Sequence, residues 1–91
     1  MALNFPNPVR LFDPGRSCIS FWGSDASLEI AFQIDIDALR KLGAETGDGE
    51  AQMLATFDSH RDAILKAAAT AYGRHKTSYH RLTAVDVSGR G

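Results

Sequence analysis

The side chains that could carry out chemistry are few, and the only cysteine is the first of them. Cys18 lies in the stretch Ser-Cys-Ile-Ser-Phe-Trp, residues 17–22, which alternates like a strand. A nucleophilic thiol needs a nearby histidine, cation or helix N-terminus to lower its pKa, and this stretch contains no helix start. A base could still come from elsewhere in the fold. We interpret Cys18 as a strand residue and keep a Cys18-dependent enzyme as the less favoured alternative.

The three histidines do not have the spacing of a metal site. His60, His75 and His80 include no pair four residues apart, and there is no second cysteine to complete a ligand set. The glycines within 43–49 precede a predicted helix, but acidic residues accompany them and would repel a phosphate group. We therefore expect no cofactor, metal ions included.

Basic and aromatic residues gather in segment 74–81. Arg74, Lys76, Tyr79 and Arg81 lie close together in a chain whose net charge is −1. Nucleic-acid-binding proteins combine cations that neutralise phosphates with aromatic rings on which bases stack. Cations at the end of a helix also stabilise the helix dipole without any ligand. Segment 74–81 is therefore our alternative binding site, with nucleic acid as its partner.

Arg61 is unusual because it falls in the apolar stripe of a predicted helix, near Phe57 and Ile64. Its aliphatic stem can cover apolar surface while the guanidinium reaches the edge of the core. Asp58, one helical turn earlier, is a suitable ion-pair partner. We favour a structural ion pair at this position. The alternative is an anchoring cation for a ligand carboxylate.

Three strands joined by tight turns are predicted in the first part of the chain. Residues 9–12 form the first, the proline and glycine of 13–16 form a turn, and 18–22 form the second. We expect the glycine at the start of 23–25 to break this second strand. The third and clearest strand is 27–34, in which every second residue is apolar and should face the core: Leu28, Ile30, Phe32 and Ile34.

Helices and a last strand are predicted to follow. An aspartate, Asp35 or Asp37, can cap a short helix that ends at Gly43. Residues 49–74 repeat apolar side chains at helical spacing and predict one long amphipathic helix. Residues 79–87 alternate again and predict a fourth strand, although neither of its faces is cleanly apolar.

These elements predict a single α+β domain over residues 1–91, with an extended lead-in at 1–8 and a frayed tail at 88–91. The sheet has four strands, mainly antiparallel, in the order β-β-β-α-α-β, and two helices pack on one face of it. The place of the last strand in the sheet is left open.

The other face of the sheet is our candidate binding surface. If the apolar row faces the helices, the alternate positions of the second and third strands face away from them. Tryptophan on an open polar face indicates a contact surface, because it is enriched among residues that anchor interfaces. An unpaired edge strand is a second route to association. The candidate residues are Trp22, Cys18, Ser20, Glu29 and Gln33.

Most of the positions in these elements also carry a family resemblance. They are the Phe5-Pro6 opening, Ile19 and Phe21, the alternating strand 28–34, and the helical residues Phe57, Arg61, Ile64, Ala68 and Tyr72. On these residues the chain resembles the bacterial domain of unknown function 1488 family over almost its whole length. The resemblance implies a small α+β protein of the bacterial cytoplasm without an established activity, and it transfers no catalytic residue.

Composition narrows the class of protein further. Hydrophobic residues make up 44% and charged residues 23%, as in ordinary globular domains, and no apolar run is long enough to span a bilayer. The N-terminus lacks the pattern of a secretory signal, and one cysteine cannot form an internal disulfide. We expect a cytoplasmic, non-catalytic binding or accessory module whose partner is itself or another protein, and which contacts no membrane.

Overall fold

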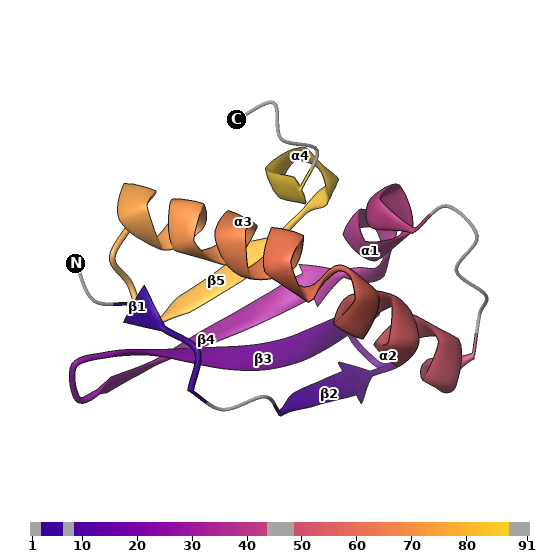
Figure 1. Ribbon diagram of the computed structural model, residues 1–91, viewed down its shortest axis with the longest axis horizontal. Helices are drawn as coiled ribbons and strands as arrows, with labels where there is room; N and C mark the ends of the chain where they lie inside the picture. The colour runs from indigo at the N-terminus through magenta and orange to yellow at the C-terminus, as the bar shows by residue number, and fades with distance from the viewer. Residues whose placement is uncertain (1–2, 7–8, 44–48, 88–91) are drawn as a thin grey trace.

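A sheet covered by helices on one side forms the molecule (Figure 1). The computed structural model describes residues 3–6, 9–43 and 49–87. The strands are β1 (Leu3–Asn4), β2 (Arg10–Asp13), β3 (Cys18–Asp25), β4 (Leu28–Asp35) and β5 (Tyr79–Leu82). The helices are α1 (Ile36–Leu42), α2 (Glu50–Ser59), α3 (Arg61–Arg74) and α4 (Ala84–Val87).

The sheet has the strand order β1-β3-β4-β5, and β2 pairs with the same edge of β3 as β1 does. All of these pairs are antiparallel except β4 with β5, which are parallel. The predicted α+β class is confirmed. The described part has five strands where we predicted four, because the lead-in contributes the short strand β1. The last strand lies at the sheet edge, beside β4.

The core lies between the sheet and the helices. Alternate residues of β3 and β4 point toward the helices, as predicted, and the register places Phe21 directly beside Phe32. Their rings stack with 5.3 Å between centroids, and Phe57 of α2 meets Phe21 edge-on at 5.3 Å. Phe5, from the lead-in, closes the cluster at 6.1 Å from Phe21. Burial of these rings removes a large apolar area from water and holds the helices on the sheet.

Gly23 does not break the second strand, contrary to our prediction. β3 continues through Gly23 to Asp25, and β1 lies alongside this end of it. A Cβ atom at position 23 would lie 2.9 Å from the Phe5 ring and 3.1 Å from both the Leu3 side chain and the Asn4 carbonyl oxygen. Glycine is therefore needed here because the lead-in approaches the strand closely.

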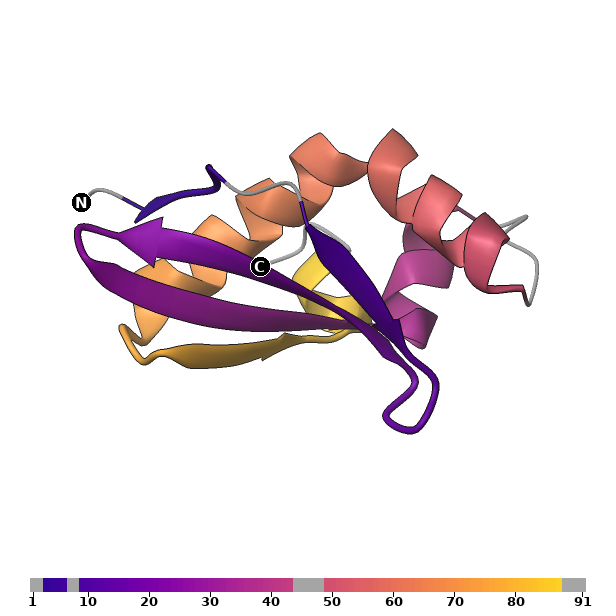
Figure 2. The same ribbon diagram turned by 90° about the horizontal axis from the view of Figure 1, so that it is seen from below.

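Residues 49–74 form two helices, not the single long helix predicted. His60 separates α2 from α3, and its φ of −113° and ψ of 21° lie outside the helical region. α2 packs on β2 and α1, whereas α3 packs on β5 and α4 (Figures 1 and 2). Phe57 before the break and Ile64 after it are both fully buried. The break therefore lets one apolar stripe follow a twisted sheet.

Both ends of β4 differ from the expectation. Leu28, predicted in the core, is 63% exposed, because the β3–β4 turn projects past the helices (Figure 1). At the other end, Asp35 occupies the N-cap of α1, as predicted, but its side chain makes no capping hydrogen bond and pairs with Arg81 instead. α1 ends before Gly43, as predicted.

The C-terminal strand is shorter than predicted. β5 ends at Leu82, and residues 84–87 form the helical turn α4. The Asp86 carboxylate accepts hydrogen bonds from the Thr83 N–H at 2.8 Å and the Thr83 hydroxyl at 3.1 Å. The bond from the Thr83 N–H to the Asp86 side chain is one half of a capping box, and it favours the start of a helix over the alternating pattern. The predicted fraying of 88–91 concerns residues outside the described part.

Replacing Gly23 with alanine tests the close packing of the lead-in. We expect Gly23→Ala to lower the free energy of unfolding by about 1–3 kcal/mol, because the new methyl group overpacks the Phe5 contact. Urea denaturation measures the change. Gly73→Ala is the matched control, since a Cβ there meets nothing within 4 Å, and it should raise stability by up to about 1 kcal/mol. Equal effects of the two substitutions would contradict this account.

Candidate functional site: the open face of the sheet

The side of the sheet away from the helices is the surface that we call the open face. Figures 1 and 2 show the helices on the opposite side only. The strand registers and the alternation of side chains define its members. They are Asn4, Leu11, Asp13, Cys18, Ser20, Trp22, Ser24, Glu29, Ala31, Gln33, Asp35, Tyr79 and Arg81.

Two aromatic residues flank a small one across the middle of this face. Trp22 of β3 pairs with Ala31 of β4, and Ala31 pairs in turn with Tyr79 of β5. Strands lie about 4.8 Å apart, so the two aromatic residues start about 10 Å from each other with a methyl group between them. Tyr79 is 50% exposed, and Trp22 is half-buried.

A chain of polar contacts fixes the neighbouring part of the face. Gln33 accepts hydrogen bonds at its side-chain oxygen from the Tyr79 hydroxyl, at 2.8 Å, and from the Arg81 guanidinium, at 3.2 Å. Arg81 also donates to the carbonyl oxygen of Arg16 at 3.0 Å, and its Nε lies 2.5 Å from Asp35 Oδ1. Tyr79 and Arg81 are therefore held in place before any partner arrives.

Asp35 neutralises the cation of this network. Burial lowers the pKa of Arg81, but the charge of Asp35 and its hydrogen bond outweigh that effect and raise the pKa overall. Arg81 is thus a charged group whose charge is compensated within the chain. It is available for stacking or hydrogen bonding rather than for attracting a distant anion.

The predicted candidate residues all lie on the open face, but two of them are covered. Trp22, Ser20 and Glu29 are at least partly exposed. Gln33 is only 8% exposed and Cys18 is completely buried, contrary to the expectation that their side faces outward to solvent or a partner. Arg81 reaches across this end of the sheet to the turn after β2, which explains the cover.

Burial also sets the chemistry of Cys18. It raises the pKa of the thiol, and the positive charge of Arg81 offsets only part of this effect. A buried thiol with a raised pKa is a poor nucleophile at neutral pH.

The alternative nucleic-acid segment does not form one surface. Arg74 ends α3 and Lys76 lies in the connection that follows, whereas Tyr79 and Arg81 belong to the open face. Sequence reasoning assigned Trp22 to one surface and Tyr79 with Arg81 to another, whereas the sheet places all three on the same face. Tyr79 and Arg81 lie on the same face as Trp22 because β5 pairs with β4. The alternation of residues within 79–87 does not indicate this pairing.

The predicted ion pair of Arg61 is confirmed. Arg61 lies 3.2 Å from Asp58, and its guanidinium carbon stands 5.0 Å from the centre of the Phe57 ring. Arg10 of β2 binds the same carboxylate with two hydrogen bonds, at 2.9 and 2.7 Å. Asp58 therefore ties α2 to the sheet, and these contacts account for Arg61 without a ligand.

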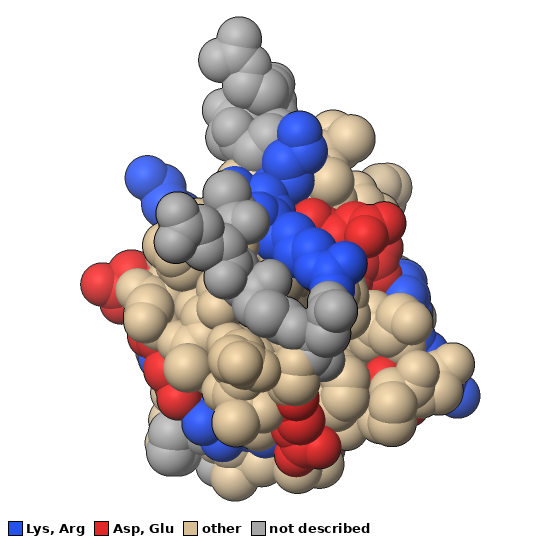
Figure 3. All heavy atoms as spheres, turned by 90° about the vertical axis from the view of Figure 1, so that its right-hand side faces the viewer, with Lys and Arg blue, Asp and Glu red and all other residues tan. Residues whose placement is uncertain are grey.

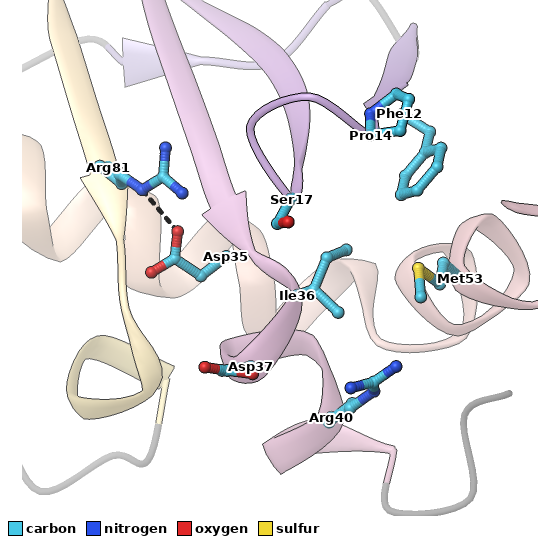
Figure 4. Close-up of a pocket in the computed structure, with 9 residues that line it drawn as sticks. All are labelled: Phe12, Pro14, Ser17, Asp35, Ile36, Asp37, Arg40, Met53 and Arg81. Atoms are coloured by element: carbon cyan, nitrogen blue, oxygen red, sulfur yellow. Dashed lines mark ion pairs between the residues drawn. The ribbon is translucent and has the colours of Figure 1, made fainter. Parts of the chain in front are cut away.

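A hollow that the sequence did not indicate adjoins the open face (Figure 4). It has a volume of about 500 Å³ and lies between the turn after β2, the start of α1, and α2. Phe12, Ile36 and Met53 give it apolar walls, and the Arg81–Asp35 pair forms its side toward the open face (Figure 4). Because these residues come from five separate elements, no sequence spacing marks the hollow.

Charged groups of both signs lie on the end of the molecule that α1 and α2 form. Figure 3, which views the end where α1 and α2 lie, shows a run of basic groups directly beside acidic groups. Within the described ranges, no group of three or more His, Cys, Asp or Glu residues could hold a metal ion. No helix in those ranges is long and apolar enough to cross a bilayer.

The fold and the open face define a small α+β domain with a one-sided sheet. The family model described as "Protein of unknown function (DUF1488)" matches residues 3–80, and the chain belongs to that family. A crystal structure of a DUF1488-family protein of unknown function from Shewanella loihica PV-4 is similar, with a TM-score of 0.79. That chain shares 20% sequence identity, and the match covers 88% of this chain and 90% of the other. No curated protein matches.

Thiol labelling tests the burial of Cys18. We expect a thiol reagent at pH 8 to modify the native protein at least ~100-fold more slowly than the urea-unfolded protein, because the reaction must wait for an opening of the structure. The readout is the labelling rate by mass spectrometry. Comparable rates in the two states would show an accessible thiol and would restore the enzyme alternative.

The charge pairs of Asp58 predict a loss of stability in acid. Hydrogen bonding to Arg10, aided by Arg61, lowers the pKa of Asp58 in the folded state. Its contribution is therefore complete above the unfolded-state pKa of about 3.9 and disappears as the pH falls through the lowered folded pKa. Since the side chain is 44% exposed, we expect only about 0.2–1 kcal/mol. Asp58→Asn should remove this part of the difference in unfolding free energy between pH 7 and pH 2. If wild type and variant lost the same unfolding free energy between pH 7 and pH 2, this role of Asp58 would be contradicted.

Proposed function

We propose that the protein is a small cytoplasmic protein-binding module, without catalytic activity, that contacts its partner through the open face. The observation that carries the proposal is the pair of aromatic residues Trp22 and Tyr79 on the side of the sheet that no described helix covers. Trp, Tyr and Arg are the residues most enriched among the energetic anchors of interfaces.

The distribution of charge on the open face supports this proposal. Its middle consists of Ser20, Trp22, Ala31, Gln33 and Tyr79, none of which is charged at neutral pH. The charged groups lie toward the two ends, and the ion pair of Arg81 with Asp35 is one of them. An uncharged centre with a charged rim is the usual anatomy of a protein–protein interface.

Preorganisation is a second support. The side chains of Tyr79 and Arg81 are already fixed by Gln33, so a partner would not have to order them on binding. Ordering a long side chain costs about 0.5–1.5 kcal/mol, and the network removes most of that cost in advance. Leu11, which is 55% exposed, extends the face with an apolar group.

The nucleic-acid alternative has less support. A binder of this kind needs several cations directed at phosphates. Of the four residues of that segment, Arg81 is compensated by Asp35, and Arg74 with Lys76 lies off the open face. Tyr79 alone remains as a platform for stacking, which is too little for a single-strand binder.

Affinity capture from an extract of the host cell tests the proposal. We expect immobilised wild-type protein to retain a specific partner, and Trp22→Ala or Tyr79→Ala to weaken its binding at least ~10-fold, because each removes an anchor ring. Once the partner is purified, titration calorimetry gives the dissociation constants. Each variant is first checked for an unchanged circular dichroism spectrum and melting temperature.

Val85→Ala is the matched control, because Val85 is 71% exposed and lies on α4, on the helical side. It should bind like wild type. Capture of the same partner with the same affinity by wild type, Trp22→Ala and Tyr79→Ala would contradict a role of the open face.

A further inference from the structure

We infer that the open face binds a second copy of this chain, with β3 of each copy lying over β4 of the other. This inference rests on the proposed function and names the partner. It comes from the sizes of the side chains in the four register pairs of β3 and β4 that point to the open face.

Each of these pairs joins a small side chain to a larger one. Trp22 pairs with Ala31, Gln33 with Ser20, Glu29 with Ser24, and Asp35 with Cys18, which is already buried within its own copy. A two-fold axis that runs along the strands between β3 and β4 places every β3 residue over the β4 partner of its own pair in the second copy. The Trp22 ring of each copy then lies over Ala31 of the other, and large groups meet small ones.

The same axis avoids electrostatic conflict. It brings Glu29 over Ser24 of the second copy and Arg81 over Leu11, whose exposed side chain can contact the aliphatic stem of the arginine. A two-fold axis that crosses the strands at Phe32 instead would bring Glu29 over Asp35, a carboxylate that Arg81 of its own copy already binds. The axis along the strands avoids this contact between two carboxylates.

The area suits a weak dimer. β3 and β4 have eight residues each and are about 26 Å long, whereas β2 and β5 have four residues each and are about 13 Å long, with about 4.8 Å between neighbouring strands. Two such faces bury roughly 800 Å² together, which is the size of a weak, transient contact. We expect a dissociation constant on the order of 10 µM rather than a permanent dimer.

Sedimentation velocity together with tryptophan fluorescence tests the inference. Trp22 is the only tryptophan, so its emission reports directly on the centre of the interface. With increasing concentration of the full chain, we expect the mass to rise from monomer to dimer and the emission to shift to shorter wavelength. Ala31→Arg should weaken association at least ~10-fold, because it fills the space for Trp22 of the second copy.

Ala69→Arg is the matched control, since Ala69 is exposed on α3, and it should associate like wild type. If Ala31→Arg does not fold, Trp22→Ala provides the same test by mass alone. A monomer at millimolar concentration, a dimer that Ala31→Arg and Trp22→Ala leave intact, or a dimer without an emission shift would each overturn the inference. A monomer whose other partner is lost in Trp22→Ala would leave the proposed function standing and refute only the second copy.

Discussion

The register between β3 and β4 is the constraint on which the rest of the structure depends. Because successive strand residues point to opposite faces, one register fixes both what is buried and what is displayed. On the inner side it joins Phe21 to Phe32, and the helices attach to this apolar surface. On the outer side the same pairing aligns Trp22 with Ala31. A slip by one residue would place the aromatic core in water and bury the polar face.

Two long-range contacts hold the helices in position over this register. Asp58 of α2 is bound by Arg10 of β2, and Tyr72 of α3 donates a hydrogen bond to Asp25 at the end of β3. Each contact joins one helix to one end of the sheet. The position of each helix therefore does not depend on the geometry of the break at His60. The hydrogen bond to Asp25 also raises the pKa of Tyr72, in keeping with a hydroxyl that acts as the donor.

The pairing of β5 with β4 at the edge of the sheet completes the open face. It brings Tyr79 and Arg81, far along the chain, next to Gln33 and Asp35. Parallel pairing requires a crossover, and α1, α2 and α3 provide it while covering the inner side. The same crossover connection thus covers the core on one side of the sheet and places the polar network on the other side.

The sequence by itself determined the elements whose signal is local. Strict alternation identified β4, a proline and a glycine marked the turn after β2, and the spacing of Asp58 and Arg61 predicted their ion pair. Only the tertiary structure decided that the strand continues through Gly23, since β1 pairs with its end and Phe5 approaches so closely that only glycine fits. It also decided the break at His60, the burial of Cys18 and the joining of Tyr79 to Trp22, because these depend on contacts between segments that no periodicity in one segment records.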